Sequence, residues 1–308
     1  MVKDRLPMLG RAPRTYQIVN VFAEQPFCGK TVAVFPDSTG LDGDSMQLIA
    51  RELGFPRTAF VLPASNEGAQ AKVRVFTPGV ELNGAGLPTI ATVFVLQGGS
   101  VEPARASAPS TRIILEQDEA PVSVAYSARV YSVRQELPTF GGTFPERETI
   151  AAVLSLRPDE LAEGPLEVAS GGVPYVMVPL KNASSLAKIK LRESIWERTL
   201  QRFEAPNLLA FALKGTPPGY LAQLRAFTPS LGVFEEPASE EACGPLIGYT
   251  LRHGLGNVAS GTHAILSQGT ELGRKSTLHV SYSHWDGVLR DLRVGGPCVG
   301  MGTGTIYA

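Results

Sequence analysis

The sequence predicts an α+β protein in which each half of the chain places strands around one buried helix. Residues 86–98 read GLPTIATVFVLQG, and almost every residue after Pro88 is apolar. A helix that is apolar on all faces has to be enclosed on all faces, so this segment is expected in the middle of a curled sheet. Residues 237–254 read PASEEACGPLIGYTLRHG and predict a second helix, with Ser239 as N-cap and Gly254 as stop signal.

Short runs rich in Val, Ile and aromatic residues precede and follow both helices, and they predict strands. A further helix over 44–53 has Asp44 or Ser45 as a possible N-cap and Gly54 as its stop signal. A loop rich in Ser, Ala and Pro over 100–111 leads into the second half, where a helix is expected over 147–156. The expected strands lie over 16–22, 31–35, 58–62, 72–77, 175–180 and 224–228.

The composition is that of an ordinary soluble globular protein. Of the 308 residues, 44% are hydrophobic and 19% are charged, and the formal net charge is -1. This balance gives no basic excess for binding nucleic acid or an anionic membrane, and no apolar run reaches the roughly 20 residues of a membrane span. Residues 1–14 are polar and lack the apolar core of a signal peptide, so we expect a disordered leader.

The cysteines and histidines indicate neither a disulfide framework nor a metal site. The three cysteines, Cys28, Cys243 and Cys298, are odd in number and widely spaced, which fits a reducing cytoplasm. No two of the four histidines have the i, i+4 spacing of a helical metal site. We therefore expect a cytoplasmic protein without a bound metal.

An acidic group surrounds the start of the second buried helix: Glu235, Glu236, Glu240 and Glu241. Acidic side chains are favoured at a helix N-terminus by a few tenths of a kcal/mol up to about 1 kcal/mol, which accounts for Glu240 and Glu241 without any function. Glu236 precedes Pro237 and lies outside the helix, so the helix dipole explains it less well. Glu236 is therefore the stronger candidate for chemistry.

Cys243 lies in the first turn of the same helix. A helix N-terminus lowers a thiol pKa and could make this residue a nucleophile or the base of a racemase. The start of the first buried helix carries no second cysteine, however, and small buried cysteines are common in protein cores. The core interpretation is favoured.

Short motifs follow one another in a characteristic order from about Tyr16 to the C-terminus. In the first half they are NVFA (20–23), G (29) with TVAVF (31–35), MQLIAREL (46–53), TAFV (58–61), VFTP (75–78), EL (81–82) and GLPT (86–89). In the second half they are GVPY (172–175), VPL (178–180), RAFTP (225–229), EPA (236–238), GPL (244–246), QG (268–269) and GRKS (273–276). Each piece is weak by itself, but the ordered series resembles the PhzF-like family of phenazine biosynthesis proteins.

This resemblance implies the diaminopimelate-epimerase-like fold, with two pseudo-symmetric domains that are each a curled, barrel-like antiparallel sheet around a central helix. The N-terminal domain would comprise 15–128 with 295–308, so the final strand near 298–307 returns to it, and the C-terminal domain would comprise 129–294. The resemblance also implies an active site between the domains, where both helix starts bind a substrate carboxylate through backbone N–H groups. The implied chemistry is proton transfer on a small carboxylate without any cofactor, in a homodimer.

Several positions depart from the catalytic pattern of the family. The family's proton-shuttling Glu aligns with Arg57, which cannot act as a base because a guanidinium stays protonated in proteins. The family's His aligns with Leu87, and its assisting Asp aligns with Glu236. A Gly-Ser pair of the family is replaced by Glu240 and Glu241. The carboxylates have thus moved from the first half of the chain to the second.

We therefore expect Glu236 to be the main acid–base residue, with Glu241 second and Glu240 third. Arg57 is expected to hold a substrate carboxylate in a bidentate pair. The other expected substrate-binding residues lie at the two helix starts: Gly86, Leu87, Ala242 and Cys243.

Three functions are compatible with these residues. The first is an isomerase that moves a proton and a double bond in a small unsaturated (amino) acid, in secondary-metabolite (antibiotic) biosynthesis. The second is an inactive ligand-binding or scaffold protein, which the loss of the family's Glu and His supports and the gain of acids opposes. The third is a cysteine-dependent racemase or epimerase, which is disfavoured because only one helix start carries a thiol. The isomerase is preferred.

Overall fold

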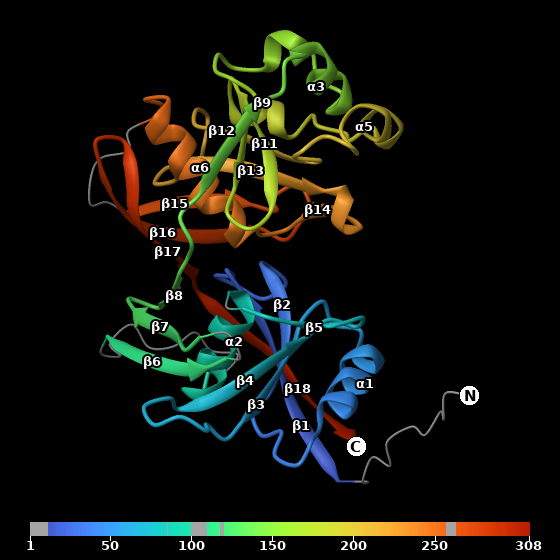
Figure 1. Ribbon diagram of the computed structural model, residues 1–308, viewed down its shortest axis with the longest axis vertical. Coiled ribbons are helices and arrows are strands. Elements are labelled where there is room, and N and C mark those ends of the chain that lie inside the picture. The colour runs from blue at the N-terminus through green and yellow to red at the C-terminus, as the bar shows by residue number, and fades with distance from the viewer. Residues whose placement is uncertain (1–11, 85, 100–109, 118–119, 257–262) are drawn as a thin grey trace. The chain divides into compact units, whose positions relative to one another are not determined.

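The computed structural model describes residues 12–84, 86–99, 110–117, 120–256 and 263–308. Tertiary contacts divide the chain into two compact units (Figure 1): unit 1 comprises Met1–Val133 with Gly296–Ala308, and unit 2 comprises Arg134–Gly295. Of the predicted leader, residues 1–11 lie outside the described residues, whereas Pro13 and Arg14 already belong to the first strand. Most of the predicted loop over 100–111 also lies outside the described residues.

Unit 1 is a sheet that is closed by both ends of the chain. The last strand, β18, pairs antiparallel with β1, which confirms the predicted return of the C-terminus to this unit. All four strands predicted in the first half of the chain are present, with bounds that differ by a few residues. The strands are β1 (Pro13–Val21), β2 (Lys30–Phe35), β3 (Thr58–Leu62), β4 (Ala71–Phe76), β5 (Glu81–Leu82), β6 (Thr111–Glu116), β7 (Val122–Ser127), β8 (Val130–Arg134) and β18 (Cys298–Tyr307).

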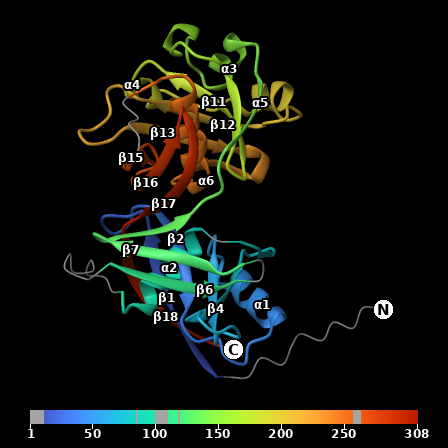
Figure 2. The same cartoon turned by 60° about the vertical axis from the view of Figure 1, so that its left-hand side comes forward.

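Helix α2 (Leu87–Leu96) is the enclosed helix of unit 1. Every residue from Leu87 to Val95 is buried, and the helix contacts β1, β2, β3, β4 and β7 (Figure 2). Pro88 occupies the first turn, where its missing N–H has no helical partner to lose. The apolar sequence of this segment therefore predicted both its helical state and its burial.

Helix α1 (Gly43–Leu53) covers a second part of the unit 1 core, formed with Phe35, Phe60 and Phe76. Its N-cap is Asp42, whose carboxylate accepts a hydrogen bond from the Ser45 backbone N–H at 2.8 Å. The predicted N-caps, Asp44 and Ser45, are therefore wrong by two or three residues. Gly54 ends the helix in the left-handed conformation, as predicted.

Unit 2 has its own sheet and its own enclosed helix. Its strands are β9 (Thr139–Thr143), β10 (Glu167–Ser170), β11 (Pro174–Leu180), β12 (Asn207–Ala212), β13 (Ala222–Thr228), β14 (Val233–Glu236), β15 (His263–Gln268), β16 (Ser276–Trp285) and β17 (Val288–Gly296). Its helices are α3 (Arg147–Val153), α4 (Ala183–Leu186), α5 (Glu193–Thr199) and α6 (Glu240–Arg252), with 3₁₀ turns at Pro158–Glu160 and Pro229–Leu231. Helix α6 contacts β10, β11 and β16 and is buried from Ala242 to Thr250, which confirms the second predicted helix.

The two units are not purely antiparallel, and this part of the predicted fold class is wrong. Parallel pairs join β2 to β3 and β4 to β6 in unit 1, and β11 to β12 and β13 to β15 in unit 2. Each of these pairs is connected through at least one helix: α1, α2, α4 with α5, and α6 respectively. A parallel pair requires such a crossover, so the helices that the sequence predicts also dictate mixed sheets.

The order of strand pairing in unit 1 recurs in unit 2. From β2 to β8 the pairs are β2–β3, β3–β4, β4–β5, β4–β6, β6–β7 and β7–β8. From β11 to β17 the pairs are β11–β12, β12–β13, β13–β14, β13–β15, β15–β16 and β16–β17, with the same senses. The connectivity is thus repeated, whereas the pseudo-symmetry of the two units in space and the predicted domain boundaries stay predictions.

Two histidines of unit 2 form a pair that predicts a pH-dependent stability. His279 Nδ1 lies 2.9 Å from His263 Nε2. Burial and the neighbouring His263 lower the pKa of His279 to about 4, and burial lowers the pKa of His263. Because the unfolded chain binds a proton near pH 6.5, stability is full above that pH and is lost as the pH falls towards 4.

We expect the free energy of unfolding to fall by about 1–2 kcal/mol between pH 7.5 and pH 5.0 through this pair. Urea unfolding of the wild type and of His279→Gln at both pH values measures the effect. The variant removes the imidazole with the lower pKa, so its stability should change less over this interval. Parallel pH profiles of the two proteins would contradict the assignment.

Candidate active site

The candidate site is built on the segment that joins β14 to α6 in unit 2. Glu236 is the last residue of β14, Pro237 and Ala238 follow, and Ser239 is the N-cap of α6. Glu240 and Glu241 form the first turn of the helix. The three predicted acid–base residues therefore lie within six consecutive positions, and all three side chains are half-buried.

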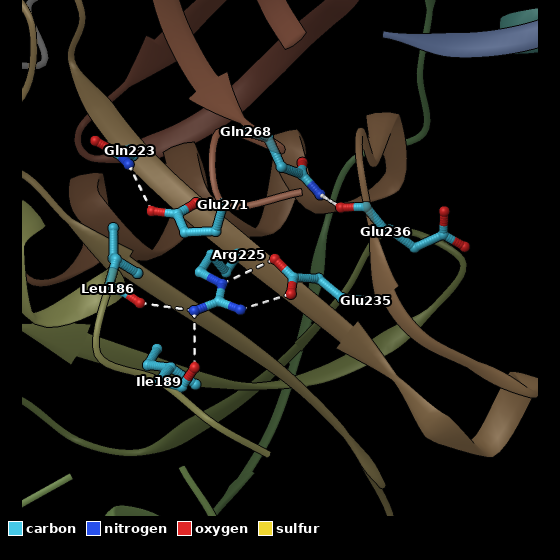
Figure 3. A network of polar contacts seen from close by, with 8 residues as sticks. All are labelled: Leu186, Ile189, Gln223, Arg225, Glu235, Glu236, Gln268 and Glu271. Carbon is cyan, nitrogen blue, oxygen red and sulfur yellow. Dashed lines mark hydrogen bonds and ion pairs between the residues drawn. The ribbon is translucent and has the colours of Figure 1, made fainter. Parts of the chain in front are cut away.

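Gln268, the last residue of β15, is buried and forms hydrogen bonds with this segment. Its side-chain carbonyl accepts a hydrogen bond from the Ser239 backbone N–H at 3.0 Å. Its side-chain amide donates to the Glu236 carbonyl at 2.8 Å (Figure 3) and to the Ser239 hydroxyl at 3.2 Å. Gln268 is 0% exposed, so these bonds form without competition from bulk water. One buried side chain thus fixes both ends of the turn that carries Glu236.

Ser276 and Gly269 hold the middle of the same turn. The Ser276 hydroxyl donates a hydrogen bond to the Pro237 carbonyl at 2.6 Å. Gly269 has a left-handed backbone conformation with a φ of +75°, and a Cβ at this position would come 2.5 Å from the Pro237 carbonyl oxygen. Only glycine fits this close approach, so the backbone around Pro237 is confined on two sides.

Glu235 and Glu236 are neighbours on β14, and their side chains have different surroundings. Glu235 forms a bidentate pair with Arg225 of β13, with distances of 2.8 and 2.6 Å. Both side chains are 9% exposed, and Arg225 also donates to the carbonyls of Leu186 and Ile189. Figure 3 shows the Glu236 carboxylate pointing away from this pair, as the alternation of side chains along a strand requires. Glu235 is therefore structural.

Tyr175 of β11 lies within electrostatic range of all three predicted acid–base residues. Burial raises the pKa of its hydroxyl far above the ordinary value, and the carboxylates of Glu241, Glu236 and Glu240 raise that pKa further. A hydrogen bond with the Ser239 side chain has the opposite effect. Tyr175 is 1% exposed and stays protonated at neutral pH. The three carboxylates thus lie within electrostatic reach of one buried neutral hydroxyl.

The turn before β11 packs against the first turn of α6. A Cβ on Gly171 would come 2.6 Å from the Glu241 carbonyl oxygen and 3.1 Å from Pro245 Cδ. Pro245 has no N–H to donate to the Glu241 carbonyl in the usual helical way. The glycine and the proline together allow β11, with Tyr175, to lie close to the helix start.

The start of α6 differs in part from what the sequence predicts. Ser239 is the N-cap, as predicted, but its hydroxyl does not cap the helix and instead bonds to Gln268. The Ala242 backbone N–H, which was expected to bind substrate, donates to the Ser239 carbonyl at 3.2 Å. Ala242 and Cys243 are both 0% exposed. Their roles as substrate-binding residues stay predictions.

Cys243 is a core thiol. Burial raises its pKa well above the ordinary value, and the carboxylates of Glu240 and Glu241 raise it further. The thiol donates to the Ser239 carbonyl at 3.6 Å. These surroundings oppose the thiolate that a cysteine-dependent racemase needs.

Replacing Cys243 by Ala is therefore expected to leave turnover unchanged and to lower the free energy of unfolding by about 1 kcal/mol, the usual effect of a small core change. Turnover is measured by the deuterium assay described below, and stability by urea unfolding. A loss of about 10²-fold or more in turnover, with the fold intact, would instead identify the thiol as a catalytic group.

The other predicted substrate-binding residues belong to unit 1. Arg57 precedes β3, is partly buried and donates from its guanidinium to the Pro56 carbonyl at 2.8 Å. Gly86 is the N-cap of α2, with a φ of 128° that favours glycine, and its carbonyl accepts from the Thr89 and Ile90 backbone N–H groups. Leu87 is buried as the first residue of α2. None of these contacts tests whether Arg57, Gly86 and Leu87 bind substrate, so these roles stay predictions.

Among the residues that the structure describes, no group of three or more His, Cys, Asp or Glu side chains could hold a metal ion. Across the same residues, none of the helices combines the length and the apolar character needed to cross a membrane. The three cysteines are buried and free.

Four supporting residues were not predicted as part of the site, although the motifs contain all of them. Gln268 and Ser276 come from the QG and GRKS motifs, Tyr175 from GVPY, and Arg225 from RAFTP. For Tyr175 and Arg225 the signal was a polar residue inside an otherwise largely apolar motif, whereas the motifs of Gln268 and Ser276 gave no such signal. The sequence did not indicate which backbone atoms these side chains would hold.

The comparisons with known proteins agree on one family. The family model described as phenazine biosynthesis-like protein (PhzC-PhzF) matches residues 19–304. A trans-2,3-dihydro-3-hydroxyanthranilate isomerase of Pseudomonas aeruginosa is 31% identical over 269 residues, covering 86% of this chain and 88% of its own. An uncharacterized isomerase of Mesorhizobium japonicum is 29% identical over 306 residues, covering 96% of this chain and 99% of its own.

A solved structure extends the similarity to the fold. The phenazine biosynthesis protein of the PhzF family from Bacillus anthracis superimposes with a TM-score of 0.82 at 22% identity, over 96% of this chain and 100% of its own. At this identity the likeness concerns the fold alone.

Proposed function

Because the chain belongs to the phenazine biosynthesis-like family, we propose that it is an isomerase that uses Glu236 to move a proton within a small unsaturated acid. Relatives that are named isomerases support the isomerase class. In the proposed reaction, a carboxylate removes a proton from one carbon and returns it to another carbon of the conjugated system. The double bond moves in the opposite direction. No electrons are gained or lost, so the step is balanced without any cofactor.

The observation that carries this proposal is the frame around Glu236. The carbonyl of Glu236 and the N–H of Ser239 are both bound by the fully buried Gln268. General acid–base catalysis requires the carboxylate to stay within hydrogen-bond reach of the carbon-bound proton, so a fixed backbone is an advantage. An inactive scaffold would have no evident need to hold this acidic turn so closely.

The neighbouring groups support a proton shuttle in different ways. Glu241 is the second candidate and Glu240 the third, and both carboxylates, like that of Glu236, raise the pKa of the Tyr175 hydroxyl. We assign the first turn of α6 and Arg57 to the binding of the substrate carboxylate, through N–H groups at a helix start and a guanidinium. Tyr175 remains a neutral hydrogen-bonding group beside the carboxylates.

We propose that the substrate is a small unsaturated amino acid of secondary metabolism and that the protein acts as a cytoplasmic homodimer. The three glutamates near Tyr175 would favour an ammonium or imine group on the substrate. The curated relative from Pseudomonas aeruginosa is named for trans-2,3-dihydro-3-hydroxyanthranilate, which is such an amino acid and supplies the first compound to test.

The experiment is isomerisation in heavy water. The purified protein is dialysed against a chelator, mixed with trans-2,3-dihydro-3-hydroxyanthranilate and with other unsaturated amino acids, and followed by proton NMR. We expect the double bond of one compound to move and one deuteron to enter the product carbon, with activity unaffected by the chelator. Exchange at a stereocentre without double-bond movement would indicate an epimerase. Binding without exchange for every compound would indicate an inactive ligand-binding protein.

A further inference from the structure

Unit 2 contains a concave site at the end of α6 that is remote from the glutamates. This cavity has a volume of about 650 Å³, within the range of pockets that bind small molecules. Its wall includes Leu255 and Gly256, which follow the C-terminal end of α6, whereas Glu240 begins that helix. A helix of 13 residues is about 20 Å long, so the cavity and the glutamate turn are separate sites.

The inner surface of the cavity is apolar. Pro179 and Leu180 come from the end of β11, Phe211 and Leu213 from β12 and the residue after it, and Leu255 from the segment that follows α6. Phe211 is only 1% exposed, so it backs the cavity, and Leu213 and Leu255, which are partly exposed, offer the apolar surface that a ligand would contact. A hydrocarbon or aromatic group of a ligand would be removed from water here.

The walls are fixed by backbone hydrogen bonds. The Ala162 N–H donates to the Pro179 carbonyl at 2.8 Å, and the Lys181 N–H donates to the Glu160 carbonyl at 3.0 Å. The Ala183 N–H donates to the Lys214 carbonyl at 2.8 Å. The strand ends that form the cavity are therefore joined to their neighbours, and the cavity is formed before any ligand arrives.

The charged residues at the rim are mainly basic. Lys181 and Lys214 both line the cavity and are exposed, and within the described part of the chain neither side chain forms an ion pair. Glu163 is the third charged residue of the lining, and it is not paired with either lysine. Two ammonium groups beside one carboxylate leave the rim with an excess of positive charge.

From the apolar floor and this basic rim, we propose that the cavity is a binding site for a small amphipathic carboxylate, distinct from the glutamate turn. The apolar part of the ligand would contact Leu213 and Leu255, and its carboxylate would lie between Lys181 and Lys214. This site does not depend on the proposed isomerase reaction.

The test uses 4-(4-fluorophenyl)butyrate as the probe and fluorine NMR of the full-length protein. We expect saturable binding with a dissociation constant on the order of 1 mM, a value typical of a probe of this size in a preformed site. The neutral amide of the same probe should bind at least about fivefold more weakly, since it lacks the charge that the lysines recognise.

Two variants and two controls locate the site. The double variant Lys181→Gln/Lys214→Gln should weaken binding of the carboxylate about tenfold, and Leu213→Asp should abolish it. Lys190→Gln removes an exposed lysine of the same unit that does not line the cavity, and it should leave binding unchanged. Glu236→Gln should also leave it unchanged, because the glutamate turn is not involved.

Circular dichroism melting confirms that each variant is folded. The proposal is overturned if the amide binds as tightly as the carboxylate, if the double lysine variant keeps full affinity, or if no saturable binding occurs in the millimolar range. A change in affinity caused by Glu236→Gln would place the probe at the glutamate turn and would equally overturn it.

Discussion

Glu236→Gln is expected to lower kcat by about 10²–10⁴-fold, the usual contribution of general acid–base catalysis. The amide keeps the size and shape of the side chain but cannot take up a proton at neutral pH. The backbone of this turn is held by Gln268 and Ser276, so the free energy of unfolding should hardly change. The rate of deuterium incorporation into the product measures kcat, and urea unfolding measures stability.

The matched variants Glu241→Gln and Glu240→Gln rank the three carboxylates. We expect Glu241→Gln to have the second-largest effect on kcat and Glu240→Gln the smallest. Full activity of Glu236→Gln together with an inactive Glu241→Gln would reverse the ranking. If none of the three changes alters turnover, the site works without these carboxylates and the proposed role of Glu236 is wrong.

Glu235→Ala is expected to lower the free energy of unfolding by about 3–5 kcal/mol, because it leaves the charge of Arg225 buried without its partner. The pair is 9% exposed on both sides and bidentate, with additional hydrogen bonds from Arg225 to the Leu186 and Ile189 carbonyls. Urea unfolding at neutral pH gives the free energy directly.

Glu236→Ala is the matched control for this measurement, since it removes the same carboxylate from the next position of the same strand. Its effect on stability should be much smaller. The double variant Arg225→Met/Glu235→Leu should recover part of the lost stability, because it removes both buried charges together. Equal stability losses in Glu235→Ala and Glu236→Ala would contradict the structural role that we assign to Glu235.

The sequence by itself determined the two enclosed helices, the strands around them and the family. The run over 87–96 is apolar apart from Thr89 and Thr92, so it has no polar face to expose, and Pro88 near its start favours a helix that is enclosed by strands. The acids that precede and begin α6 were also visible as a group, and Pro237 separated Glu236 from the helix. These conclusions depend on local periodicity and on the order of motifs, which the sequence contains directly.

The tertiary structure decided which of four neighbouring acids are structural and which remain as candidates for chemistry. Glu235 and Glu236 are adjacent and chemically identical, and only the direction of each side chain from β14 assigns one of them to Arg225. The parallel strand pairs and the bonds of Gln268 to the Glu236 turn likewise join residues that are distant in the sequence. Such contacts depend on strand register and on the packing of crossover helices, and local sequence patterns do not specify either of them.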